Sequence, residues 1–143
     1  MANIKKVFVH CTDSEDSLDI GFREIDEWHR QRGWLSDSGI SCGYHWIVRR
    51  NGTIEAGRPE SERGAHVRGQ NSISIGIVWV GRKVPGPKQY NELLKKIRDI
   101  IDRHGLEVTD VYGHKEADSN KTCPNLNMHQ LRAELLFTRG EDK

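Results

Sequence analysis

The sequence predicts an α/β fold of the mixed α+β kind, in which a central mixed β-sheet of about five strands is flanked by about three helices. Short runs rich in β-branched and aromatic residues recur along the chain, and the run 74–80 is almost wholly apolar, as in a strand covered on both faces. Segments of helical period alternate with these runs, most clearly over residues 87–105. The 143 residues have the size of one domain and contain no repeats or linkers. We therefore expect residues 1–143 to form a single domain with helices on both sides of the sheet.

The first part of the chain predicts one strand and one helix. The run IKKVFVH is the first expected strand, and it ends at His10. After a polar segment, Phe22, Ile25 and Trp28 repeat at three-residue spacing, which is typical of an amphipathic helix. Gly33 can adopt the left-handed conformation that ends such a helix.

The middle of the chain predicts a β-hairpin. Residues 44–50 and 53–56 are its expected strands, and Asn51 and Gly52 between them favour a type I′ turn, in which both residues have positive φ. A loop over residues 57–69 then leads to the apolar strand 74–80.

The last part of the chain predicts two helices with a strand and a loop between them. The long helical period ends at Gly105, and residues 106–112 then alternate as a strand does. No apolar period survives in residues 113–124, which we expect to be a loop. Asn127 is the expected cap of the last helix, with Gln130 three residues further on, as in a capping box.

Composition and charge exclude several classes of partner. The formal net charge of +1 gives no basic face, so we expect no nucleic-acid binding. No apolar stretch is long enough to cross a bilayer, and MANIKK leads directly into a strand, so we expect no membrane contact and no signal peptide. The three cysteines are an odd number, which argues against a disulfide framework and leaves a thiol for a metal or the core.

A candidate metal site comes from residues near the ends of expected strands. His10 ends the first strand, His114 follows the strand 106–112, and Cys123 lies further along the same loop, two residues after Lys121. Imidazole nitrogen and thiolate sulfur are preferred zinc ligands, and a catalytic zinc has three protein ligands and one open position. Each residue alone is more often an ordinary polar or buried side chain, but the combination favours zinc.

Four blocks of sequence carry a resemblance to a known family. They are VFVHCTDS, GYHWIVRRNGTIEAGRP, RGAHVRGQNSISIGIVWVG and GHKEADSNKTCP. In this order and at these separations they resemble the zinc-dependent N-acetylmuramoyl-L-alanine amidases of the phage lysozyme and peptidoglycan-recognition type. The resemblance covers the chain from the first strand to Pro124. It implies hydrolysis of the amide between the lactyl group of N-acetylmuramic acid and the L-alanine of the stem peptide in peptidoglycan.

The resemblance also implies roles for individual residues. The family's zinc ligands fall on His10, His114 and Cys123, and its catalytic residues fall on Tyr44 and Lys121. Zinc lowers the pKa of a bound water, a lysine can stabilise a developing oxyanion, and a tyrosine can donate a hydrogen bond or carry a proton. Without the resemblance, the tyrosine would be expected to pack and the lysine to be solvated.

Four further polar residues have less direct roles. The resemblance places His66 and Asn71 in the substrate cleft, although both are otherwise ordinary polar residues of loops. We expect His29, beside Trp28, to be a packed and hydrogen-bonded core histidine, and His45 to be either a histidine that supports a metal ligand or a structural one.

Three functions remain open from the sequence. The preferred one is a phage or prophage endolysin that acts as a monomer on peptidoglycan and stays in the cytoplasm until it is released to the cell wall. The second is a peptidoglycan-binding module without catalysis, but relatives of that kind tend to lack the cysteine ligand, so Cys123 argues against it. The third is an amidase that also regulates a phage RNA polymerase, as some family members do. No polymerase-binding surface is identifiable in the sequence.

Overall fold

The computed structural model describes residues 3–141, with side chains up to residue 137, around one five-stranded sheet of strand order β3-β2-β4-β1-β5. The strands are β1 (Lys6–Cys11), β2 (Trp46–Val48), β3 (Ile54–Ala56), β4 (Ser74–Trp79) and β5 (Val111–Gly113). The helices are α1 (Phe22–Gln31), α2 (Pro87–His104), the 3-10 helix η1 (Val108–Asp110), α3 (His114–Ala117) and α4 (Met128–Glu141).

The sheet is mixed, as the sequence predicts. β1 lies parallel to both β4 and β5, and β2 is parallel to β4, whereas β3 is antiparallel to β2. Every residue of β4 is buried, because this strand lies in the middle of the sheet and is covered on both faces. Its nearly continuous apolar sequence follows from that position.

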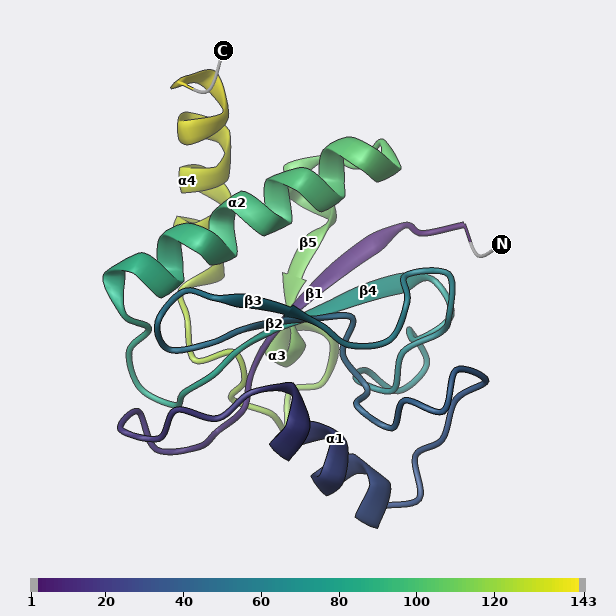
Figure 1. Ribbon diagram of the computed structural model, residues 1–143. Coiled ribbons are helices and arrows are strands. Elements are labelled where there is room, and N and C mark those ends of the chain that lie inside the picture. Colours follow the sequence, from purple (N-terminus) through teal and green to yellow (C-terminus); the bar gives the residue numbers. More distant parts are fainter. Residues whose placement is uncertain (1–2, 142–143) are drawn as a thin grey trace.

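Helices cover both faces of the sheet, so the predicted layers are confirmed (Figure 1). The larger core lies under α2 and α4, and a smaller one lies under α1. α2 begins with Pro87 at its first turn and ends at Gly105, whose φ of +66° gives the left-handed cap. Its buried apolar stripe consists of Leu93, Leu94, Ile97, Ile100 and Ile101.

The inward face of α1 differs from the prediction. Ile25 is buried, but its buried neighbours are Asp26 and His29, whereas Trp28 is 42% exposed. Asp26 Oδ1 accepts hydrogen bonds from the backbone N–H groups of residues 41 and 42 at 2.8 Å, and His29 Nδ1 accepts one from Gly43 at 2.7 Å. These polar side chains satisfy the backbone of a distant loop, which outweighs the burial of one more aromatic ring. The expectation that His29 is a hydrogen-bonded core histidine is confirmed.

The hairpin has a different turn from the predicted type I′. Only Gly52 has a positive φ, +91°, and Asn51 does not. The Gly52 N–H donates to Arg49 O at 2.9 Å, and the Arg49 N–H donates to Thr53 O at 2.8 Å. The result is a tight turn followed by a left-handed glycine, the usual form of a three-residue hairpin loop.

The segment after α2 also differs from the prediction. Only Val111–Gly113 forms strand β5, and η1 takes the place of the expected first half of the strand. The Asp110 carboxylate accepts a hydrogen bond from the Glu107 N–H at 2.9 Å, which favours a local turn over extended backbone. The expected loop begins instead with the short helix α3, where Glu116 accepts from the Gly113 N–H at 2.8 Å. The described chain therefore has four α-helices rather than about three.

The start of α4 follows the prediction in part. Asn127 Oδ1 accepts a hydrogen bond from the Gln130 N–H at 3.0 Å, as an N-cap does. The Gln130 side chain donates forward to Glu134 at 2.8 Å, and among the described residues it accepts no hydrogen bond from the Asn127 N–H, so only half of the capping box forms. Within residues 3–141, no helix combines the length and the apolar character needed to span a membrane.

Candidate active site

Two histidines meet at the carboxyl edge of the sheet. β1 and β5 are adjacent and parallel, and Val9 pairs with Gly113, so the next residues along each strand, His10 and His114, lie side by side. Their ring centroids are 4.8 Å apart. The carboxyl ends of parallel strands are where open α/β sheets place their ligand sites. The predicted meeting of two strand-end histidines is therefore present.

Cys123 completes a cluster of three metal-ligand side chains. One ligand atom from each of His10, His114 and Cys123 lies within 4.8 Å of the other two. The backbone N–H of Cys11 donates to Cys123 Sγ at 3.0 Å, and Trp79 Nε1–H donates to Pro124 O at 2.9 Å. The loop that carries the cysteine is thereby fastened to the ends of β1 and β4.

The pKa values of His10, His114 and Cys123 are consistent with their binding a zinc ion. Burial lowers the pKa of His10 well below its ordinary value, as do, to a smaller extent, the neighbouring His66 and His114. Burial and then Lys121 lower the pKa of His114. Both imidazoles are therefore neutral, as metal ligands must be. A hydrogen bond with Cys11 and burial raise the pKa of the Cys123 thiol, so a thiolate at this position needs a cation beside it.

Tyr44 and Lys121, the two predicted catalytic residues, both face this cluster. The Tyr44 ring centroid is 5.0 Å from that of His10, and burial raises the pKa of its phenol, which keeps the hydroxyl protonated. Lys121 is exposed and lines the same 380 Å³ pocket as Tyr44, His114 and Cys123. The structure thus gathers the five residues that the sequence places in three separate blocks.

His66 and Asn71, the predicted substrate-binding residues, lie beside the cluster and are engaged within the protein. His66 is 9% exposed, and its Nδ1 is 2.8 Å from His10 Nε2. Burial, followed by the charges of other histidines, lowers the pKa of His66 to about 3. Asn71 Oδ1 accepts hydrogen bonds from the N–H groups of His66 and Val67 at 2.8 and 2.9 Å. Both residues still line a pocket next to His114 and Lys121.

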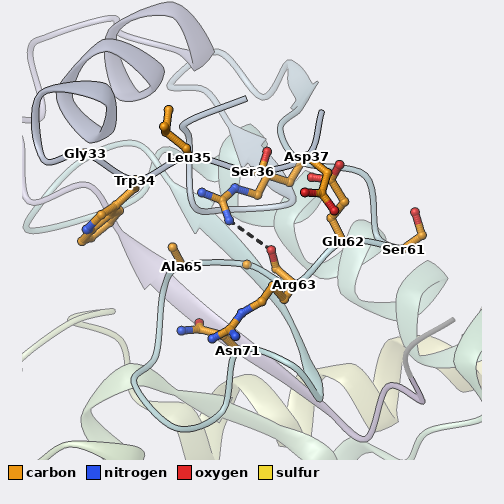
Figure 2. Close-up of a pocket in the computed structure, with 12 residues that line it drawn as sticks. Gly33, Trp34, Leu35, Ser36, Asp37, Ser61, Glu62, Arg63, Ala65 and Asn71 are labelled. Carbon is orange, nitrogen blue, oxygen red and sulfur yellow. Dashed lines mark hydrogen bonds between the residues drawn. The ribbon is translucent and has the colours of Figure 1, made fainter. Parts of the chain in front are cut away.

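A second pocket of 560 Å³ adjoins the metal cluster. Residues 33–37 line one side of it and residues 61–65 the other, and Asn71 lies near Arg63 (Figure 2). Trp34 and Ala65 line both this pocket and the one at the cluster, so the two pockets are neighbours, and we call them together the groove. Sequence reasoning missed Trp34 because it lies in a segment without apolar period, where nothing distinguishes a groove wall from an ordinary loop.

The fold and the three-ligand cluster together define an α/β protein with a candidate zinc site at its sheet edge. The chain belongs to the N-acetylmuramoyl-L-alanine amidase family, Amidase_2, whose model matches residues 1–126. The resemblance noted from the sequence blocks is therefore confirmed.

The relatives are phage endolysins, bacterial amidases and peptidoglycan-recognition proteins. The endolysin of Klebsiella phage KP32 is 47% identical over 76 residues, which cover 53% of this chain and 47% of the relative. The chain thus spans about half the length of the curated endolysins that it matches. The solved amidase LysC of Clostridium intestinale is 32% identical, with a TM-score of 0.81 over 94% of this chain and 86% of LysC. Peptidoglycan-recognition protein 2 of Holotrichia diomphalia is 28% identical over 96% of this chain and 76% of its own length.

Proposed function

We propose that this protein is a zinc-dependent N-acetylmuramoyl-L-alanine amidase, with residues 1–143 as its amidase domain. The single observation that carries the proposal is the convergence of His10, His114 and Cys123, whose ligand atoms lie within 4.8 Å of one another at the sheet edge. Two neutral imidazoles and one thiol form a donor set typical of catalytic zinc with an open coordination position. Membership of the amidase family supports the same reaction.

The reaction needs strong activation because an amide is a poor electrophile with a poor leaving group. His10, His114 and Cys123 would hold the zinc ion, which would supply Lewis acidity to polarise the scissile carbonyl and lower the pKa of a water molecule. The chain contributes the fixed positions of His10 and His114 at two adjacent strand ends and of Cys123 on a fastened loop. These positions do not have to be organised during the reaction, which is the main advantage of a preorganised site.

Two further side chains supply the proton and charge chemistry. Lys121 carries a positive charge on the rim of the cluster, where it can stabilise the oxygen on which negative charge develops. Tyr44 keeps its proton because burial raises the pKa of the phenol, so its hydroxyl can donate a hydrogen bond to the reacting groups.

The groove fits an extended substrate such as a peptidoglycan strand with its stem peptide. It consists of the pocket at the cluster and the larger pocket on the other side of Trp34, and both are lined by polar as well as apolar side chains. A polymer can therefore place its amide at the cluster while its neighbouring groups occupy the second pocket.

The biological role that we propose is host lysis by a phage or prophage endolysin. Endolysins of phages KP32 and T7 are both 47% identical to this chain over about half its length. In this role the enzyme stays in the cytoplasm until it is released to the cell wall, and it acts as a monomer on peptidoglycan.

Digestion of purified peptidoglycan tests the reaction. We expect free stem peptides with new L-alanine amino termini and intact glycan strands, measured by amino-terminal labelling and mass spectrometry. New reducing sugar ends without new amino termini would mean that the protein is a glycosidase. Binding to the wall without any new termini would mean that it is a recognition module.

Replacing a ligand tests the role of the metal. Cys123→Ser should abolish turnover and lower the zinc content, while circular dichroism stays that of the parent, because serine is close to cysteine in size and keeps the packing of this loop against the core. Lysis by the variant at the parental rate would refute the ligand assignment.

A further inference from the structure

We propose that His66 is a positioning residue that fixes the ring orientation and tautomer of His10 through a chain of hydrogen bonds ending at the backbone of Gln70. The inference rests on the proposed zinc site, because its consequence is the choice of the His10 nitrogen that binds the metal. The chain runs from His10 to His66 and then to Ser74, and all three side chains are buried.

The donors and acceptors along this series of hydrogen bonds follow from its last bond, the one between Ser74 and Gln70. Ser74 Oγ donates its proton to Gln70 O at 2.7 Å. A hydroxyl has one proton, so Ser74 Oγ can only accept at its other contact, the 3.3 Å approach to His66 Nε2. His66 Nε2 therefore carries the hydrogen, and the Nδ1 of this neutral imidazole is an acceptor.

The same logic determines the tautomer of His10. His66 Nδ1 lies 2.8 Å from His10 Nε2, and since Nδ1 is an acceptor, His10 Nε2 must donate. A neutral imidazole that carries its hydrogen on Nε2 has a free lone pair on Nδ1. These hydrogen bonds thus leave Nδ1 as the nitrogen of His10 that can bind a metal. The opposite direction of donation would place a hydrogen on that nitrogen and block it.

The surrounding fold keeps His66 in this place. A Cβ on Gly76 of β4 would lie only 2.8 Å from both Cγ and Nδ1 of His66, so the strand leaves room for the ring by having no side chain there. Asn71 holds the backbone on the other side by accepting from the His66 and Val67 N–H groups. Asn71 therefore contributes to the site by anchoring His66.

Residues that accept a hydrogen bond from a metal ligand, as His66 does from His10, change the affinity for the metal. A ligand histidine whose second nitrogen donates a hydrogen bond is held in one orientation and is a better donor to the metal, and loss of the partner costs about 10–100-fold in affinity. We expect that range for His66→Ala. His66→Asn, whose amide oxygen can replace the Nδ1 acceptor, should recover most of the loss. Ser74→Ala should weaken zinc binding less than His66→Ala does.

The first measurement is zinc affinity by competition with a chromophoric chelator, on the parent and on each variant. His104→Gln is the matched control, because it also removes a partly buried, hydrogen-bonded histidine, one that contacts Glu60 at 2.8 Å rather than the cluster. Its zinc affinity should equal that of the parent. A parent that fails to bind zinc would refute the proposed function itself, whereas parental affinity in His66→Ala would refute only the role of His66.

The second measurement needs no substitution. Imidazole nitrogen chemical shifts of the zinc-loaded parent should show hydrogen on Nε2 of both His10 and His66. Hydrogen on His66 Nδ1, or zinc on His10 Nε2, would overturn the inference even if a variant failed to fold.

Discussion

Burial sets the ionisation of the individual residues around the site. It is the first cause of the lowered pKa values of His10, His66 and His114, and it raises the pKa of Tyr44. The imidazoles are therefore available as neutral ligands or acceptors at neutral pH, and the phenol remains a donor. Lys121, by contrast, lies exposed at the rim, where it can act on a substrate as a cation.

Lys121 provides a test that separates catalysis from metal binding. Lys121→Ala should retain zinc and slow amide hydrolysis by about 10²–10³-fold, the usual loss when a single oxyanion donor is removed. Turnover and zinc content are measured on the same preparation. Lys115→Ala is the control, since Lys115 is an exposed lysine of α3 that does not line the pocket at the cluster. Equal rates of hydrolysis for the two variants would show that Lys121 is a solvated surface residue without a catalytic role.

His29 predicts a pH dependence of stability. Burial, followed by Arg32 and Arg58, lowers its pKa from 6.5 to about 4. Between these pH values the unfolded chain binds a proton that the folded protein does not, so the stability present above pH 6.5 is lost as the pH falls through about 4. We expect the unfolding free energy of the parent to fall relative to that of His29→Asn by on the order of 1–3 kcal/mol across this window. Urea unfolding at several pH values measures it, and a constant difference would contradict the prediction.

At the scale of secondary structure, the site depends on the register of adjacent strands. The pairing of Val9 with Gly113 brings His10 beside His114, and the parallel alignment of β1 with β4 sets the place of Gly76 opposite Phe8. Short elements suffice for this purpose, because three paired residues of β5 already position the histidine that follows the strand.

Gly76 provides a test at this scale. Gly76→Ala should destabilise the protein by about 1–3 kcal/mol through overpacking, because the new methyl group meets the buried His66 ring. Gly86→Ala is the matched control: its Cβ would meet its nearest atom at 3.6 Å, an ordinary contact. Chemical denaturation measures both variants. A Gly76→Ala protein as stable as Gly86→Ala would show that the ring has room to move.

At the scale of the whole molecule, the proposed metal joins segments that are far apart in the sequence. His10 lies on β1, whereas His114 and Cys123 come from the segment after β5, more than a hundred residues later. A metal held by all three residues binds only the folded chain and therefore stabilises it by mass action.

Removing the metal should therefore lower the thermal stability of the parent. With free zinc at a hundred times the dissociation constant, the expected stabilisation is about 2.7 kcal/mol. Chelation should lower the melting temperature, added zinc should restore it, and Cys123→Ser should respond much less to either treatment. Differential scanning calorimetry checks this, and an equal response of parent and variant would place the metal elsewhere.

Much of the fold was predictable from local sequence. Period and composition located the buried strand β4, the long helix α2 and the capped start of α4, because each depends mainly on residues near to it in the chain. The five residues at the cluster were also predictable from the sequence, because four blocks resemble those of a known family. The types of residue and their order along the chain thus already specified the expected chemistry.

Tertiary structure alone decided which side chains face inward and what they contact. Asp26 rather than the predicted Trp28 lies on the inward face of α1, because its carboxylate accepts hydrogen bonds from the backbone N–H groups of residues 41 and 42. His66 became the partner of His10 across 56 positions of sequence, a contact that no local pattern encodes. Both outcomes have one physical reason: a buried polar group must find a hydrogen-bond partner, and only the folded chain determines which distant group is within reach.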